Sequence, residues 1–368
     1  MIYIHVPFCH RKCTYCAFFS KPVGSGQWAV GSYVDVLLEE MRQRRDEQAH
    51  PIKTVYWGGG TPSILPLREL ERIVKALHDN FDLSQVEEAT LEANPEDLTM
   101  DYLQGLKKIG LINRLSIGIQ SLDDEMLRLL NRRHTAAQAI EAIENAHKAG
   151  FHNISADFIY GLPEVGGRKS EVGGDFSYLI PHTSYLISHL SAYALTIEPG
   201  TALAVQVEQG RVVLPDEEEV VRQYYALRQQ FLNAGFRQYE VSNFARPGYE
   251  SKHNSRYWNR TPYLGLGPSA HSFNGFRRRW NKPDGTFEEE TLTPADAYNE
   301  LLMTSLRTTR GLSLDTVPEE YKERLHREMQ PYIDCGWIVV RSEVGGMRYA
   351  PTPEGLLHAD GIAAALFV

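Results

Sequence analysis

The chain has 368 residues, of which 42% are hydrophobic and 23% charged, and its formal net charge at pH 7 is −9. We expect a soluble globular protein with one large domain and a smaller one. The negative charge argues against a nucleic-acid partner, and no apolar run is suited to a membrane span or a signal peptide.

The first half of the chain alternates short apolar runs with longer amphipathic stretches, which is typical of βα units and a parallel sheet. Helices are expected between the strands, for example over 27–48 and from Thr135 to Gly150. About six units occur, fewer than the eight of a closed barrel, so we predict a partial (β/α)6 TIM-like barrel. The predicted strands span residues 2–6, 54–57, 88–93, 114–118, 154–159 and 185–194.

The second half changes character. A long helix over 215–233 is followed by an aromatic, polar stretch that we predict to be loop-rich. Beyond it, the pattern indicates two helices, a hairpin joined by Gly345-Gly346 and a closing helix near Thr352, which together suggest a small winged-helix-like α+β domain. The domains expected from these changes are 1–234, 235–290 and 291–368.

Three of the four cysteines follow the first predicted strand in a C-x3-C-x2-C pattern: Cys9, Cys13 and Cys16. Thiolates hold iron–sulfur clusters, and three ligands on a four-iron cluster leave one iron open for a small molecule. Zinc, with His5 or His10 as a fourth ligand, is the alternative, and chance clustering is another. Zinc cysteines usually come as two separated C-x2-C pairs, so the spacing favours the cluster.

The fourth cysteine, Cys335, stands apart in the sequence, and we interpret it as a small buried hydrophobe. Clustered cysteines without a disulfide framework fit a reducing compartment. The expected location is therefore the cytoplasm.

The cysteine spacing, the turn Tyr56-Trp57-Gly58-Gly59-Gly60-Thr61-Pro62 and the six βα units together resemble the radical S-adenosylmethionine (SAM) superfamily over nearly the whole chain. In that family the open iron binds the amino and carboxylate groups of SAM, whose cleavage gives a 5′-deoxyadenosyl radical. Within it, the chain is most similar to the coproporphyrinogen III oxidase branch, which includes HemN and HemW. The resemblance implies a [4Fe-4S] cluster and SAM as cofactors.

The resemblance also implies a set of residues that contact SAM. Without the family, each of these residues alone would be interpreted as a core, capping or surface residue. Glycines let backbone N–H groups approach a ligand closely, and a carboxylate at a strand end can accept from ribose hydroxyls. Most of the set follows strand C-termini, where parallel folds place their sites. The expected SAM residues are Tyr3, Gly59, Gly60, Thr61, Glu92, Gln120, Arg132 and Asp157. The oxidase binds a second SAM through residues that correspond to Gly60, Thr61, Gln120, Arg132 and Asp157 of this chain.

Two departures separate the chain from the oxidase. Phe18 stands where the oxidase has a fourth cysteine, as it does in HemW. The oxidase also carries a longer N-terminal segment, for which we expect no room before Tyr3. Both departures put decarboxylation of a porphyrinogen in doubt.

A second run matches the H-N-x-x-Y-W signature of HemW, which is associated with heme binding: His253-Asn254-Ser255-Arg256-Tyr257-Trp258. Histidine is the commonest protein donor to heme iron, which makes His253 the candidate axial ligand. Asn254 could orient its imidazole, and the two aromatic rings could stack on a macrocycle. A packed aromatic loop with a hydrogen-bonded histidine is the alternative. His271 is a second ligand candidate, and it could equally line the SAM pocket.

Three functions follow from the resemblance. A heme chaperone would bind heme and pass it to an acceptor such as a respiratory-chain hemoprotein. The alternatives are an oxygen-independent coproporphyrinogen III oxidase and a radical SAM enzyme with another substrate. The expected partners include an electron donor for the cluster, and the sequence leaves open whether the protein forms a homodimer.

Overall fold

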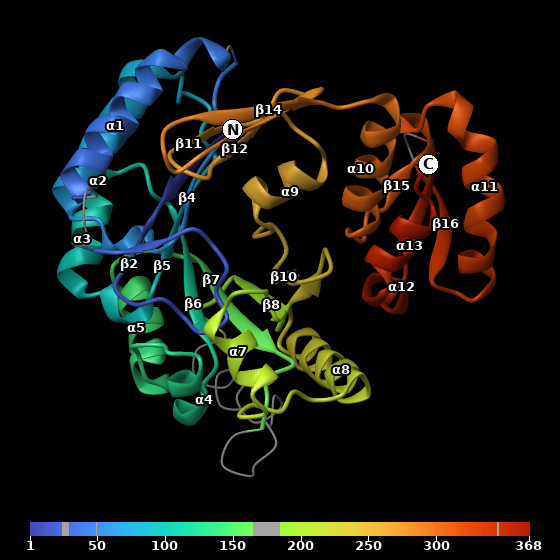
Figure 1. Cartoon of the computed structure of the whole chain (residues 1–368), viewed down its shortest axis with the longest axis horizontal. Helices are drawn as coiled ribbons and strands as arrows, with labels where there is room; N and C mark the ends of the chain where they lie inside the picture. The colour runs from blue at the N-terminus through green and yellow to red at the C-terminus, as the bar shows by residue number, and fades with distance from the viewer. Residues whose placement is uncertain (24–28, 49, 165–184, 344–345) are drawn as a thin grey trace.

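A nine-stranded, mostly parallel sheet forms the centre of the protein (Figure 1). The computed structural model describes residues 1–23, 29–48, 50–164, 185–343 and 346–368. Seven neighbouring strands run parallel, and two antiparallel strands complete one edge. In spatial order the strands are β11 (Leu264–Leu266), β1 (Ile2–Val6), β4 (Thr54–Gly59), β5 (Glu88–Ala93), β6 (Arg114–Gln120), β7 (Asn153–Tyr160), β8 (His189–Ala194), β10 (Asn243–Ala245) and β9 (Arg237–Gln238).

Six of these strands, β1 and β4 to β8, lie side by side in chain order, which confirms the predicted (β/α)6 arrangement. Apolar side chains from the strands, such as Ile4, Trp57 and Phe158, are fully buried in the main core. Figure 1 shows α1, α2, α3 and α5 along the outer side of the sheet. The helices of this part are α1 (Val30–Gln43), α2 (Leu67–Asn80), α3 (Met100–Ile109), α4 (Asp124–Leu129), α5 (Ala136–Lys148), α7 (Ala202–Glu208) and α8 (Glu217–Asn233).

Local sequence sets several of these helix ends. Thr135 and Gln138 form a reciprocal capping box at the start of α5, as the Thr135 side chain predicted. Gly150, just after that helix, has a φ of 90°, which L-residues with a side chain rarely adopt. The predicted and observed helix bounds differ most for the first helix, which was predicted over 27–48 and is observed as α1 over Val30–Gln43.

The stretch from 235 to 280, predicted to be loop-rich, also contains short strands and a helix that the prediction did not include. It contributes β9, β10 and β11 to the central sheet and contains the helix α9 (Lys252–Trp258). It also begins an antiparallel ribbon of β12 (His271–Phe273), β13 (Arg277–Asn281) and β14 (Phe287–Thr291). Strands of two or three residues show no alternation of apolar and polar side chains, so periodicity could not reveal them.

The C-terminal part has its own apolar core, which includes Leu302, Leu325 and Met329. It consists of α10 (Pro294–Leu306), β15 (Leu312–Ser313), α11 (Glu319–Asp334), β16 (Ile338–Glu343), β17 (Gly346–Pro351), α12 (Pro353–Leu357) and α13 (Ala359–Ala365). The strands form one antiparallel sheet in the order β15-β17-β16. The predicted helices and hairpin are present, while Gly345 of the predicted turn lies outside the described residues. The exact domain boundaries stay a prediction.

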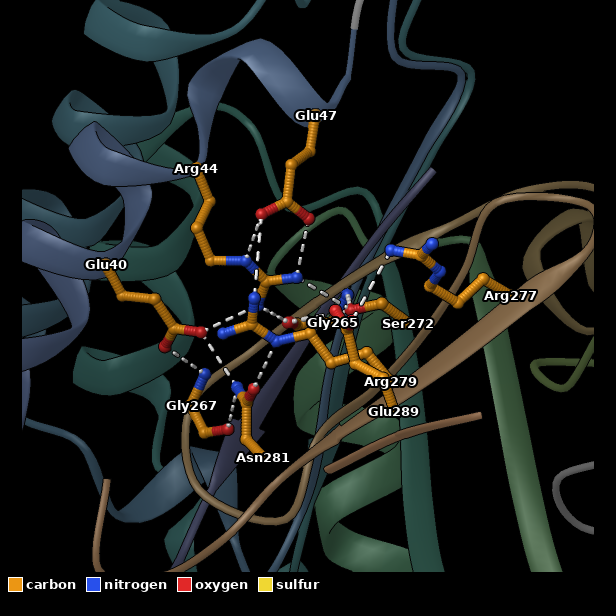
Figure 2. Close-up of polar contacts among 10 residues, drawn as sticks. All are labelled: Glu40, Arg44, Glu47, Gly265, Gly267, Ser272, Arg277, Arg279, Asn281 and Glu289. Carbon is orange, nitrogen blue, oxygen red and sulfur yellow. Dashed lines mark hydrogen bonds and ion pairs between the residues drawn. The ribbon is translucent and has the colours of Figure 1, made fainter. Parts of the chain in front are cut away.

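A buried arginine ties α1 to the β11–β13 region (Figure 2). The Arg44 guanidinium donates to the carbonyl of Gly265 at 2.8 Å and to Ser272 Oγ at 3.0 Å, and it pairs with Glu40 and Glu47. Asn281 Nδ2 donates to Glu40 Oε1 at 2.8 Å from the other side. Segments more than 200 residues apart are thereby fixed against one another.

No helix in the described ranges is both long and apolar enough to cross a membrane.

Candidate functional site

The cysteine loop is closed at its ends by two short parallel strands, β2 (Phe8–Cys9) and β3 (Lys21–Pro22). Midway, the N–H of Thr14 donates to the carbonyl of Leu130 at 3.2 Å, and the carbonyl of Thr14 accepts from the N–H of Leu203 at 2.8 Å. The loop is thus anchored on α7 and on the turn after α4. It places three partly buried thiols at the wall of one cavity of about 690 Å³: Cys9, Cys13 and Cys16.

The same cavity collects residues from the C-terminal ends of several strands. A bulge between Gly118 and Gln120 accompanies a φ of 69° at Gln120, and such bulges redirect side chains. Parallel strands bring these ends to one side of the sheet, as the sequence led us to expect. The predicted residues that line the cavity with the cysteines are Gly59, Gly60, Thr61, Glu92, Gln120, Arg132 and Asp157.

A chain of hydrogen bonds connects two of the cysteines. Thr61 Oγ1 donates to Cys9 Sγ at 3.4 Å and accepts from Asn94 Nδ2 at 3.3 Å. Arg132 donates to Asn94 Oδ1 at 2.7 Å and to Cys13 Sγ at 3.4 Å. Donors on thiolate sulfur stabilise its negative charge, and they are one of the means by which proteins set cluster potentials.

Two carboxyl groups occupy the interior side of the cavity. Glu92 accepts from the Tyr56 hydroxyl at 2.8 Å and from the Gly59 N–H at 3.2 Å. Burial raises the pKa of Glu92 to about 7, and the nearby Asp157 acts in the same direction. Asp157 accepts from the hydroxyls of Ser116 and Ser155 at 2.7 and 2.8 Å. Around neutral pH, Glu92 can therefore serve a polar ligand as an acceptor or as a donor.

Comparison with known proteins shows the family to which the chain belongs. A model of the Radical SAM superfamily matches residues 3–169. The chain is 31% identical to the heme chaperone HemW of Synechocystis sp., covering 99% of this chain and 95% of that protein. It is 33% identical to HemW of Lactococcus lactis, covering 89% and 87%.

The chain belongs to the HemW family of radical SAM proteins.

Among solved structures, coproporphyrinogen III oxidase (HemN) from Escherichia coli matches with a TM-score of 0.81. The match covers all of this chain and 89% of the oxidase at 22% identity. At that identity the likeness concerns the fold, and it agrees with the predicted radical SAM barrel.

Radical SAM membership of a HemW-family chain implies a [4Fe-4S] cluster and SAM, and the cavity residues fit both. Within the described part of the chain, no three His, Cys, Asp or Glu side chains are grouped to hold a single metal ion. A cubane takes its three thiolates on different irons, so it does not need them to converge on one point. His5, one alternative zinc ligand, has Nδ1 3.2 Å from the Tyr3 hydroxyl and Nε2 3.0 Å from the carbonyl of Phe19.

Tyr3 does not line the larger cavity with the other expected SAM residues. Its ring lines a second, smaller cavity of about 260 Å³ rather than the larger one. The ring stacks on that of Tyr56, which lines the larger cavity, with centroids 6.1 Å apart. Phe18, which is 69% exposed, lines both cavities.

The HemW-type signature lies on α9 rather than in a loop. Because His253 and Tyr257 are one helical turn apart, His253 Nε2 meets the Tyr257 hydroxyl at 3.1 Å, while Nδ1 meets Thr54 Oγ1 at 2.9 Å. The ring is fully buried, and burial lowers the pKa of His253 to about 3. Both nitrogens are engaged in this arrangement, so iron ligation by His253 stays a prediction. Asn254, expected to orient the ring, instead lines the larger cavity.

Sequence reasoning missed several cavity residues. Asn94 directly follows the predicted strand 88–93, and a polar residue at the end of a parallel strand is itself a signal for a site. Arg114, 1% exposed at the start of β6, also lines the cavity, as do Ser191 and Tyr193. Their positions within strands gave no local cue.

Cys335 was predicted to be buried, and this is wrong. It is exposed at the C-terminal end of α11, where it follows the last residue of the helix. The buried residues of the helix are Leu325 and Met329, and Cys335 is not among the residues that pack against the C-terminal core.

Proposed function

We propose that this protein is a heme chaperone, which holds a [4Fe-4S] cluster and SAM in the larger cavity, binds heme, and passes it to an acceptor hemoprotein such as a respiratory enzyme. The observation that carries the proposal is the 31–33% identity to proteins named heme chaperone HemW over most of the chain. Phe18 supports it, because a phenyl ring cannot supply the thiol that the oxidase motif has there.

The residues of the larger cavity have distinct tasks in this proposal. The cysteines would hold the cluster, and Arg132 and Thr61 would donate to cluster thiolates through the contacts described above. Glu92 and Asp157 would bind polar groups of SAM at the strand ends. When bound, the cluster and SAM supply an open iron and a sulfonium that one electron can cleave.

The heme ligand predicted from the sequence is His253. It would have to release the Tyr257 hydroxyl before its Nε2 could bind iron. The proposal further includes an electron donor for the cluster and a cytoplasmic location, where thiols stay reduced. Sedimentation of the reconstituted protein would settle whether it forms a homodimer.

The proposal is tested by heme transfer. Anaerobically reconstituted protein is loaded with one equivalent of hemin and mixed with the apo form of a b-type cytochrome, and the Soret band is followed. We expect hemin binding and transfer that is faster than from an equal amount of hemin on serum albumin. Absence of hemin binding, or transfer no faster than from albumin, would contradict the proposal.

Oxidase activity is the second candidate, favoured by one observation. All five residues that match the second SAM site of the oxidase line the larger cavity: Gly60, Thr61, Gln120, Arg132 and Asp157. Incubation with coproporphyrinogen III, SAM and a reductant distinguishes the two. Stoichiometric release of carbon dioxide and 5′-deoxyadenosine would establish the oxidase, whereas a heme chaperone should release neither in amounts that depend on coproporphyrinogen.

A further inference from the structure

One face of β6 lines the larger cavity along the whole strand. Arg114, Ser116 and Gly118 are alternate residues of the strand and therefore share this face, and Gln120 lines the cavity at its end. A strand rises about 3.3 Å per residue, which places the backbone of Arg114 about 20 Å from that of Gln120. The cavity thus continues from the C-terminal end of the strand toward its start, where no ligand has been assigned so far.

The Arg114 side chain at this inner end has no partner in the part of the chain that the structure describes. The residue is 1% exposed, and its Nε is buried without a hydrogen bond. Within the described ranges, no hydrogen bond or ion pair joins its guanidinium to another residue. Arg132, on the same cavity wall, differs, because it donates to Asn94 Oδ1 and to the carbonyl of Gly118, both at 2.7 Å.

The acidic residues of the cavity wall do not supply the missing charge. They are Glu92, Asp157 and Glu198, and none of these three forms an ion pair with Arg114. The two carboxylate oxygens of Asp157 each accept from a serine hydroxyl instead. Glu92 accepts from the Tyr56 hydroxyl, and its pKa of about 7 leaves it only partly ionised at neutral pH.

A second buried polar atom without a hydrogen bond lies next to this arginine. Thr90 pairs with Arg114 across the β5–β6 ladder, and its Oγ1 has no partner among the described residues. Adjacent strands are about 4.8 Å apart, so the two side chains leave neighbouring positions on one face. Buried polar atoms are nearly always hydrogen-bonded, and each exception needs an explanation. Water could satisfy such atoms, but it would not neutralise a buried charge.

The chemistry of the site favours an organic carboxylate. A guanidinium has a planar fork of N–H donors that matches the two oxygens of a carboxylate or a phosphate. Glu92 and Asp157 on the same wall would repel a doubly charged phosphate more strongly than a singly charged carboxylate. Tyr56 and Tyr193 also line the cavity, and their rings can contact the apolar part of such a ligand.

We propose that the larger cavity holds an organic carboxylate, whose carboxylate group is bound by the guanidinium of Arg114 at the start of β6. The group belongs either to SAM or to a second small molecule, and both would present the same two oxygens to the arginine. This inference goes beyond the proposed heme-chaperone function and does not depend on heme binding.

The test is a titration of the full-length, anaerobically reconstituted protein with para-fluorobenzoate, followed by fluorine NMR. Its neutral amide, para-fluorobenzamide, is the comparison ligand. Wild type should bind the carboxylate at least about tenfold more tightly than the amide, and Arg114→Gln should lose this preference. Arg237→Gln, at an exposed arginine of β9, should keep it.

Urea unfolding shows whether the protein itself satisfies this arginine. Without a carboxylate, Arg114→Met should unfold at a urea midpoint no lower than that of wild type, because the substitution breaks no hydrogen bond or ion pair and removes a buried charge. A clearly lower midpoint would mean that the guanidinium is held by the fold, and it would overturn the inference.

A SAM titration of wild type and Arg114→Gln identifies the source of the carboxylate. An approximately tenfold weaker SAM affinity in Arg114→Gln would support the inference with SAM as the source, and an unchanged one, with para-fluorobenzoate binding lost, would support it with a second molecule. Wild type that does not prefer para-fluorobenzoate to the amide, or equal affinities in Arg114→Gln and wild type, would overturn it. Hemin transfer tests the chaperone proposal separately, so either can fail alone.

Discussion

Single side chains in the larger cavity are held by one another across four strands of the sheet. Thr61, Asn94 and Arg132 form a continuous hydrogen-bonded chain whose two ends reach the thiols of Cys9 and Cys13. A change at any of the three would leave a donor or acceptor unpaired near a thiolate. The predicted cluster ligands are therefore supported by residues that follow other strands.

The cysteines themselves allow a direct prediction. Changing Cys16 to Ala should leave the reconstituted protein without most of its iron and sulfide, because the cluster would then have only two of its three protein ligands. Cys335→Ala is the matched control, since this thiol is exposed on the C-terminal part, and it should bind normal amounts. Iron and acid-labile sulfide analysis gives the answer, and four irons in the Cys16 variant would refute the ligand assignment.

Glu92 predicts a pH dependence of stability. Its pKa is about 7 in the folded protein, against 4.5 for an exposed glutamate, so unfolding releases its proton between these pH values. Its effect on stability is nil below pH 4.5, becomes unfavourable as pH rises to 7, and is constant above. Glu92→Gln should therefore gain up to about 3 kcal/mol relative to wild type over that window.

Urea unfolding of both proteins at several pH values between 4 and 8 measures this difference. Glu141→Gln, at an exposed glutamate of α5, is the control and should show no such trend. A difference between Glu92→Gln and wild type that does not change with pH would show that Glu92 ionises normally in the folded protein.

At the scale of elements, α1 and the β11–β13 region illustrate how distant segments position the smaller cavity. Arg44, 5% exposed, satisfies Glu40, Glu47, the carbonyl of Gly265 and the Ser272 hydroxyl together. The segment between Gly265 and Ser272 carries Ser269 and His271, which line the smaller cavity. The geometry of that cavity thus depends on the C-terminal end of a helix that begins at Val30.

Removing this arginine should be costly. Arg44→Ala would leave Glu40 without its charged partner in a buried setting, and we expect a loss of about 3–5 kcal/mol in the free energy of unfolding. Arg42→Ala, two residues earlier, removes an arginine whose side chain is 66% exposed and should change it by less than about 0.5 kcal/mol. Denaturant unfolding of the two variants checks the prediction, and equal losses would contradict it.

At the scale of the whole molecule, the C-terminal part is joined to the barrel by a few specific contacts. The N–H of Val241 donates to the carbonyl of Arg307 at 2.9 Å, and the N–H of Thr309 donates to that of Tyr239 at 3.0 Å. Glu300 on α10 pairs with Arg260 after α9 at 3.3 Å and with Arg278 on β13 at 2.6 Å. The ion pairs therefore connect three elements around the HNxxYW helix.

Glu300→Ala should release both arginines at once. We expect a loss of about 1–2 kcal/mol and faster amide hydrogen exchange in α9 and α10, with exchange in β4 to β7 unchanged. Glu290→Ala removes the weaker partner of Arg278, 3.8 Å away, and should leave exchange as in wild type. Uniformly faster exchange in the Glu300 variant would mean that the effect is global rather than confined to this junction.

The sequence by itself determined the fold class, and it predicted the cluster ligands and part of the lining of the larger cavity. Strands of five to eight residues separated by amphipathic helices imply a parallel sheet, and such a sheet brings strand C-termini together whatever the details of packing. Cys9, Cys13 and Cys16 are close in sequence, so one loop necessarily places them together. The family resemblance added the prediction that residues at the ends of those strands bind SAM.

Only the tertiary structure decided the placement of Tyr3, His253, Asn94 and His271. Whether a histidine faces a cavity or a hydroxyl depends on contacts with residues far away in the chain: His253 meets Thr54, 199 residues earlier. The strands β9 to β11 were also beyond prediction, because their pairing partners, not their short sequences, make them strands. A side chain's partners across the sheet are set by packing, which no local pattern encodes.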